Sequence, residues 1–117
     1  MTNDPTLVKV MEAARGSWAG SGEHVTMKTL RVDGTDAHIG IIKVTGLRVV
    51  EYFVTTDEPA LWDTLAFFAK TRGWTYRAVV PLPLMGTAHN NLIHTPIQLQ
   101  GWWVHGNRIS FGTPEIA

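Results

Sequence analysis

The sequence contains no cysteine among its 117 residues. This absence excludes disulfides, thiol nucleophiles and zinc sites built on thiolates. The N-terminal segment MTNDPTLVKV also lacks the basic and then apolar order of a signal peptide. Together these two features predict a cytoplasmic location.

Charge of either sign is sparse. Charged residues make up 17% of the chain, with ten acidic and ten basic residues that give a formal net charge of zero. Because nucleic acids and anionic membranes attract proteins through a basic field, neither is expected as the main partner. No apolar run approaches the roughly 20 residues of a membrane-spanning helix, so we expect no membrane segment.

Tryptophan is abundant for this length, with five residues. A surface that is low in charge and rich in tryptophan favours contact with another copy of the chain, a protein partner or a small apolar ligand. A chain of this length folds as one domain with a real core.

The clearest helix signal lies in residues 57–73. Thr56 or Asp57 can cap the first turn, Pro59 suits its start, and Gly73 suits its end. The predicted core-facing arc, at 100° per residue, consists of Leu61, Trp62, Leu65, Ala66, Phe68 and Ala69.

Phe67 falls on the opposite, polar side of this helix, between Asp63 and Thr71. Two interpretations remain open. Either a loop or tail of the same chain covers Phe67, or Phe67 forms a contact surface for a partner.

A second helix is predicted over residues 3–15. Asp4 can cap it, Pro5 suits its first position, and Leu7 and Met11 lie on one face that can rest on a sheet. Gly16 is the expected end of this helix.

Residues 16–22, GSWAGSG, have the spacing G-x-W-x-G-x-G. This spacing resembles the opening of some small β-barrel ligand binders, the nitrobindin-like and lipocalin-like calyces. The resemblance implies a continuous run of strands, which the helix predicted at 57–73 would interrupt. The other interpretation is a flexible connector in which Trp18 closes the end of the core.

Residues 24–56 predict an antiparallel β-meander with strands at 24–32, 37–44 and 47–55. Asp33-Gly34 and Thr45-Gly46 supply the turns. A two-residue turn at Thr45-Gly46 places Ile41 opposite Val50, with His38 and Glu51 on one shared face. Both faces of this meander carry apolar residues, so each needs a cover.

Residues 75–112 predict further strands. The extended segment 76–84 contains Pro81 and Pro83, which predict a sheet edge or an exit from the sheet. Residues 85–96 have no regular periodicity and predict a loop. Residues 97–104 and 108–111 predict a hairpin that pairs Trp102 with Phe111 and Val104 with Ile109. Gly101 predicts a bulge, and the tail 112–117 is expected to be loose or lent to a neighbour.

The predicted fold is therefore a single α+β domain over residues 1–117. Its element order is αβββαβββ, an antiparallel sheet packed against two helices.

Histidines are the main candidates for chemistry. His89 and His94 share the predicted loop with Asn90, and these three residues are the candidate catalytic set. The plainer interpretation is a polar surface loop. His38 and Glu51 could act as base and orienter, or satisfy each other at a sheet edge. No metal signature is present, so neither a metal nor a cofactor is expected.

Two functional hypotheses follow. The first is a non-catalytic binding protein that self-associates, as a dimer, and binds through an aromatic and apolar surface or pocket. Its candidate binding residues are Phe67, Trp18, Trp102, Trp103, His38 and Glu51. The second is a small hydrolase or lyase that uses the His89/His94 loop, in which a metal could take part. Imidazoles converging in a pocket would favour the enzyme, and a convex loop would favour the binder.

Overall fold

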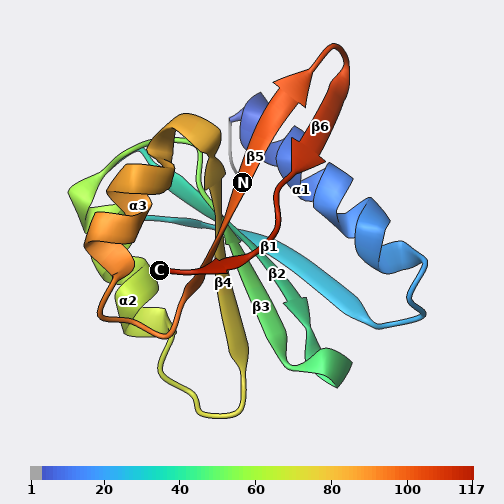
Figure 1. Ribbon diagram of the computed structural model, residues 1–117, viewed down its shortest axis with the longest axis horizontal. Coiled ribbons are helices and arrows are strands. Elements are labelled where there is room, and N and C mark those ends of the chain that lie inside the picture. Colours follow the sequence, from blue (N-terminus) through green and yellow to red (C-terminus); the bar gives the residue numbers. More distant parts are fainter. Residues whose placement is uncertain (1–3) are drawn as a thin grey trace.

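A twisted, mixed sheet of seven strands runs through residues 4–117, with helices on both of its faces (Figure 1). The computed structural model describes residues 4–117. The strand order is β1-β2-β3-β4-β5-β6, and β7 pairs with β5. The α+β class is confirmed.

The strands are β1 (Val25–Arg31), β2 (His38–Val44), β3 (Val49–Phe53), β4 (Thr75–Pro81), β5 (Gln98–His105), β6 (Arg108–Phe111) and β7 (Glu115–Ile116). The helices are α1 (Pro5–Ala19), α2 (Pro59–Phe68) and α3 (Met85–Leu92), with short 3-10 turns at Thr45–Leu47 and Leu82–Leu84.

The prediction of a wholly antiparallel sheet is wrong at its centre. β3 pairs with β4 in parallel, and β4 pairs with β5 in parallel. Helix α2 connects β3 to β4, and α3 connects β4 to β5. Each helix returns the chain to the end of the sheet where the preceding strand began, so the next strand runs parallel to it. The missed helix α3 therefore explains the wrong direction of the β4–β5 pair, whereas the β3–β4 pair is joined by the predicted helix α2 and its direction was wrong although that helix was expected.

Helix α3 occupies most of the segment that the sequence predicts as a loop. No side chain caps its start, and it has only eight residues, MGTAHNNL. Its folding depends on burial, since Ala88 and Leu92, one turn apart, are fully buried against the sheet. Such a helix has almost no signal in local sequence.

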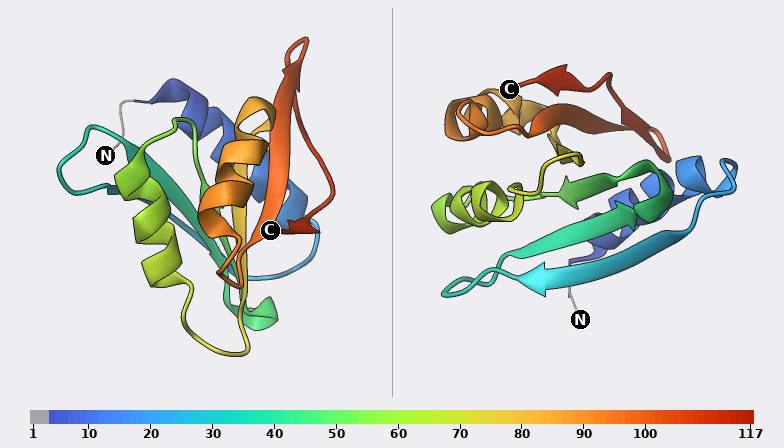
Figure 2. Two further views of the ribbon diagram at one scale, coloured as in Figure 1. Left: turned by 60° about the vertical axis from the view of Figure 1, so that its left-hand side comes forward. Right: turned by 90° about the horizontal axis from the view of Figure 1, so that it is seen from below.

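Helix α1 covers one face of the sheet, while α2 and α3 cover the other (Figure 2). The prediction that both faces need covers is confirmed, and one chain supplies a helix layer to each. The cap by Asp4 is confirmed, because its Oδ1 accepts from the backbone N–H groups of Thr6 and Leu7 at 3.0 and 3.1 Å.

The predicted end of α1 at Gly16 is wrong, and the predicted start at residue 3 lies outside the described residues. The helix continues to Ala19, with Gly20 as its cap. A Cβ at Gly16 would meet nothing within 4 Å, so Gly16 lies on the open side of the helix. Trp18 therefore lies in the last helical turn rather than in a connector.

Helix α2 presents the predicted face to the core, since Leu61, Trp62 and Leu65 are buried. It begins at Pro59, with Glu58 rather than Thr56 or Asp57 at the cap, and it ends at Phe68. Residues 69–74 form a connecting loop that approaches β4.

The β2–β3 connection is a 3-10 turn followed by Arg48 in the left-handed region, with φ 55°. Val50 therefore pairs with Lys43 rather than with the predicted Ile41. This shift of two residues leaves every side chain on its predicted face, because side chains alternate with a period of two.

The C-terminal hairpin is confirmed, with Trp102 opposite Phe111 and Val104 opposite Ile109. The bulge at Gly101 is wrong, because the β4–β5 pairing runs through it without interruption. A Cβ at Gly101 would lie 3.0 Å from Leu82 Cδ1, so this glycine allows a close approach.

Two further predictions for the C-terminal half need correction. The segment around Pro81 leaves the sheet there, as expected, but β4 is an interior strand and not an edge. The tail is not loose, since β7 pairs with Gln98 and Leu99 of β5. Among residues 4–117, none of the helices combines the length and apolar character needed to cross a membrane.

Candidate ligand-binding groove

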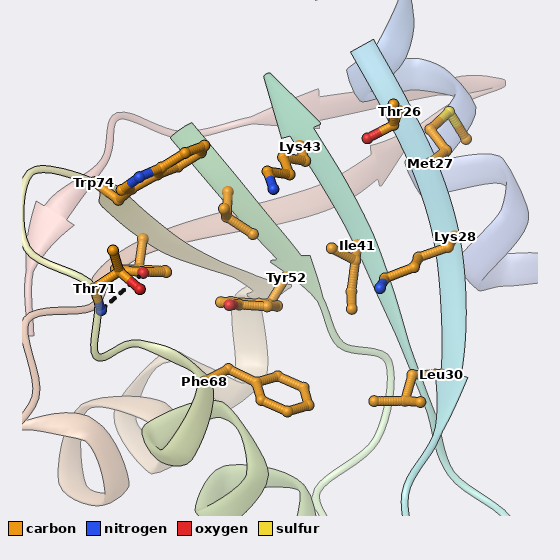
Figure 3. Close-up of a pocket in the computed structure, with 12 residues that line it drawn as sticks. Thr26, Met27, Lys28, Leu30, Ile41, Lys43, Tyr52, Phe68, Thr71 and Trp74 are labelled. Carbon is orange, nitrogen blue, oxygen red and sulfur yellow. Dashed lines mark hydrogen bonds between the residues drawn. The ribbon is translucent and has the colours of Figure 1, made fainter. Parts of the chain in front are cut away.

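An open groove of about 710 Å³ lies beside α2, over the part of this sheet face that α2 and α3 leave uncovered (Figure 3). We call it the ligand groove. Its lining consists of Thr26, Met27, Lys28, Leu30, Ile41, Lys43, Val50, Tyr52, Phe68, Thr71, Trp74 and Tyr76.

The floor of the ligand groove is an apolar patch of the sheet. Ile41 of β2 pairs with Tyr52 of β3, and Val50 of β3 pairs with Tyr76 of β4. These four side chains share one face because paired residues in neighbouring strands point the same way. All four are at most 8% exposed, so they form a closely packed and largely desolvated floor.

The aromatic rings in the groove are ordered relative to each other. The rings of Tyr52 and Tyr76 are parallel within 2°, with centroids 6.3 Å apart. The Phe68 ring lies 6.0 Å from that of Tyr52. The Tyr76 hydroxyl accepts from the Thr71 backbone N–H at 3.1 Å, which ties the loop after α2 to the floor.

Burial, and secondarily the neighbouring Tyr76, raises the pKa of Tyr52 to about 12. The Tyr52 phenol therefore stays protonated throughout the physiological range. It therefore supplies no phenolate base or nucleophile to the groove.

Two lysines give the groove its charge. Lys28 of β1 and Lys43 of β2 lie diagonally across the β1–β2 pairing and extend over the floor (Figure 3). The Lys43 Nζ lies 5.1 Å from the centre of the Trp74 ring, which forms part of the wall. The groove lining includes no aspartate or glutamate, and neither lysine forms a salt bridge within residues 4–117. The groove is therefore cationic as well as aromatic.

A second groove, of about 500 Å³, adjoins the first along α2. Leu30 and Phe68 line both grooves, so the two form one trough between α2 and β1. Phe67 lies in the second groove and is 66% exposed, as its place on the predicted helix indicated.

A polar cluster lies on the opposite face, beneath α1. Glu51 is 4% exposed and accepts from Trp18 Nε1 at 2.8 Å and from Arg77 Nη1 at 3.1 Å. A small cavity of about 160 Å³ adjoins these three side chains. The charges of Glu51 and Arg77 neutralise each other. Because Trp18 belongs to α1, its hydrogen bond to Glu51 attaches α1 to the sheet.

The predicted pairing of His38 with Glu51 is wrong. Glu51 is opposite Ile42, four residues along β2 from His38, whose own partner in β1 is Arg31. Of the two, only Glu51 is held in a polar cluster.

The candidate catalytic residues do not converge on a pocket. His89 and Asn90 lie on α3, His94 follows it, and all three side chains are exposed. None of them lines the ligand groove, the second groove or the small cavity. In residues 4–117, no group of three or more histidine, aspartate or glutamate side chains is placed to hold a metal ion.

The predicted tryptophan sites separate into different environments. Trp102 is 7% exposed and belongs to the core beneath α1, where its Nε1 donates to the Val54 carbonyl at 3.4 Å. Trp103 is 37% exposed and lines none of the three cavities. Trp74, which sequence reasoning did not select, is the tryptophan in the ligand groove.

Lys28 and Lys43 were also missed, although a signal for them exists. Both alternate in step with the apolar residues of their strands, so the predicted hairpin at Asp33-Gly34 would have placed them on one face.

Comparison with protein-family models, with curated proteins and with solved structures found no match.

Proposed function

We propose that this chain is a non-catalytic binding protein whose ligand groove takes a flat, apolar molecule that carries an acidic group. The observation that carries the proposal is the combination of two half-buried aromatic side chains, Phe68 and Trp74, with two lysines and no carboxylate in the lining. Flat aromatic surfaces favour stacked or edge-on rings, and the unpaired ammonium groups favour an anion at the rim.

The volume of the groove fits this proposal. A value of about 710 Å³ lies within the range of roughly 300–1,000 Å³ that is usual for small-molecule sites. The proposal does not extend to a hydrolase or lyase, because His89, Asn90 and His94 line none of the described cavities.

The test uses two fluorescent probes that differ in charge. 8-Anilinonaphthalene-1-sulfonate carries a sulfonate, and N-phenyl-1-naphthylamine has the same rings without it. We expect the sulfonate to bind the folded protein at one site. Exchanging Lys43 for Gln should weaken its binding roughly tenfold, the scale of one charge-assisted hydrogen bond, while the neutral probe is little affected.

Trp74→Ala should weaken the binding of both probes, because it removes an aromatic side chain from the wall of the groove. Trp103→Ala is the matched control, since it removes a tryptophan outside the groove. Near-ultraviolet circular dichroism must show that each variant keeps its tertiary structure, because partly folded chains also bind the sulfonate. Sulfonate binding that is unchanged by both Lys43→Gln and Trp74→Ala would refute the proposed site.

A further inference from the structure

The outer flank of α2 carries an unusual stripe. Asp63 and Phe67 lie one turn apart on α2, and Lys70 lies in the turn just after the helix ends at Phe68. All three are exposed, with Phe67 at 66%. The Lys70 Nζ lies 4.5 Å from the centre of the Phe67 ring.

The charges at the two ends of this stripe are opposite. Neither Asp63 nor Lys70 forms a salt bridge with another of the residues 4–117. A two-fold rotation near Phe67 would place a second α2 antiparallel to the first. Asp63 of one copy would then lie opposite the partner's Lys70, and the two Phe67 side chains would lie between these two pairs. The stripe is therefore complementary to itself.

The second groove offers apolar surface beside this stripe. Leu30, at 38% exposure, and Phe68 line it together with Phe67. An aromatic side chain from another copy could therefore be buried between α2 and β1.

We infer that this flank of α2 is the interface of a symmetric homodimer. Phe67 of each copy packs in the second groove of the other, and Asp63 pairs with the partner's Lys70 in two equivalent contacts. Because Leu30 and Phe68 also line the ligand groove, the partner closes the end of that groove. The dimer itself requires no ligand, so its test is independent of the proposed binding function.

The experiment is sedimentation velocity of the full chain without ligand, over a range of micromolar concentrations. We expect the wild type to sediment with twice the mass of the 13.0 kDa chain. Phe67→Asp should raise the dissociation constant of the dimer at least about tenfold, because it places two charges at the centre of the contact. Val104→Asp, at a site of 60% exposure on the distant β5–β6 hairpin, is the matched control and should leave the dimer intact.

Charge reversal tests the pairing itself. In the proposed dimer, Asp63→Lys alone places two positive charges opposite each other at both contacts, and Lys70→Asp alone places two negative charges there. The dimer of each single variant should therefore dissociate. Mixing the two variants restores two opposite pairs, and the mixture should sediment as a heterodimer. The double variant Asp63→Lys/Lys70→Asp should dimerise by itself for the same reason. Recovery in the mixture also shows that each single variant is folded.

Three results would overturn the inference. A wild type that stays monomeric at the highest concentration leaves no dimer to explain. A dimer that Phe67→Asp leaves intact must associate through another surface. Dissociated single variants that fail to associate when mixed would show that Asp63 does not meet the partner's Lys70.

Discussion

Arg77 donates from Nη1 to Glu51 Oε2 at 3.1 Å, and the two residues are direct partners across the parallel strands β3 and β4. Their side chains are only 17% and 6% exposed. The Arg77 Nε is also buried and makes no hydrogen bond within the described residues. Glu51 is therefore the main compensation for a buried positive charge.

Removing Glu51 should consequently be costly. We expect Glu51→Ala to lower the free energy of unfolding by about 3–5 kcal/mol, because it leaves the Arg77 guanidinium buried without its counter-charge. Glu51→Leu combined with Arg77→Met should lose much less, since both charges are then absent. Urea denaturation of both variants measures this difference. Equal losses would show that the ion pair is not what the single substitution disrupts.

The core face of α2 gives a second prediction. Leu65 is fully buried among the residues between α2 and the sheet. Leu65→Ala should lower the free energy of unfolding by about 2–5 kcal/mol, as a large-to-small change in a packed core. Val104→Ala, at an exposed position, is the control and should change it by less than about 0.5 kcal/mol. A loss at Leu65 no larger than the control would contradict the assigned face.

Gly40 of β2 gives a third prediction, because it lets α1 lie close to the sheet. A Cβ at this position would collide with Met11 Sδ and lie 3.1 Å from Leu7 Cδ1. Gly40→Ala should therefore destabilise the protein by about 1–3 kcal/mol through overpacking. In the combined variant with Met11→Ala, the added methyl no longer meets the thioether. If the alanine at position 40 is as costly there as in the wild type, crowding against Met11 is not the cause.

Alkaline pH tests the buried phenol. The pKa of Tyr52 is raised to about 12 in the folded protein, whereas an unfolded tyrosine ionises near 10. Between about pH 10 and 12 the unfolded chain therefore loses a proton that the folded chain retains, and the free energy of unfolding falls as the pH rises. Tyr52→Phe should reduce this decline, measured by denaturation at several pH values.

The phenol can also be observed directly. The chain contains two tyrosines, so Tyr76→Phe leaves Tyr52 as the only one. Its phenolate absorbance should appear well above pH 10 in this variant, because burial is the larger cause of the shift. A midpoint near pH 10 while the protein remains folded would show that Tyr52 is open to water.

Sequence reasoning predicts the parts of this fold that rest on local patterns. The core face of α2, the cap at Asp4 and the hairpin that pairs Trp102 with Phe111 all follow from periodicity, capping and turn chemistry. The predicted partner of Val50 is wrong by two residues, but the predicted faces of both strands are still correct, because side chains alternate with a period of two.

The remainder depends on contacts between distant segments. Helix α3 is stabilised by burying Ala88 and Leu92, and without that helix the direction of β5 could not be predicted. The ligand groove was not predicted for a similar reason. Its wall at Trp74 belongs to a loop whose position is fixed by the Tyr76 hydroxyl, and no local pattern indicates that contact.

Helix α1 is attached near both of its ends to the same part of the sheet. The Asp4 carboxylate accepts from the Thr55 hydroxyl at 2.6 Å, and Trp18 donates to Glu51 at 2.8 Å. Glu51 lies in β3, and Thr55 follows that strand by two residues. The slowest amide protons of α1 should therefore exchange with solvent deuterium together with those of β3, as one cooperative opening unit, although about 30 residues separate them along the chain.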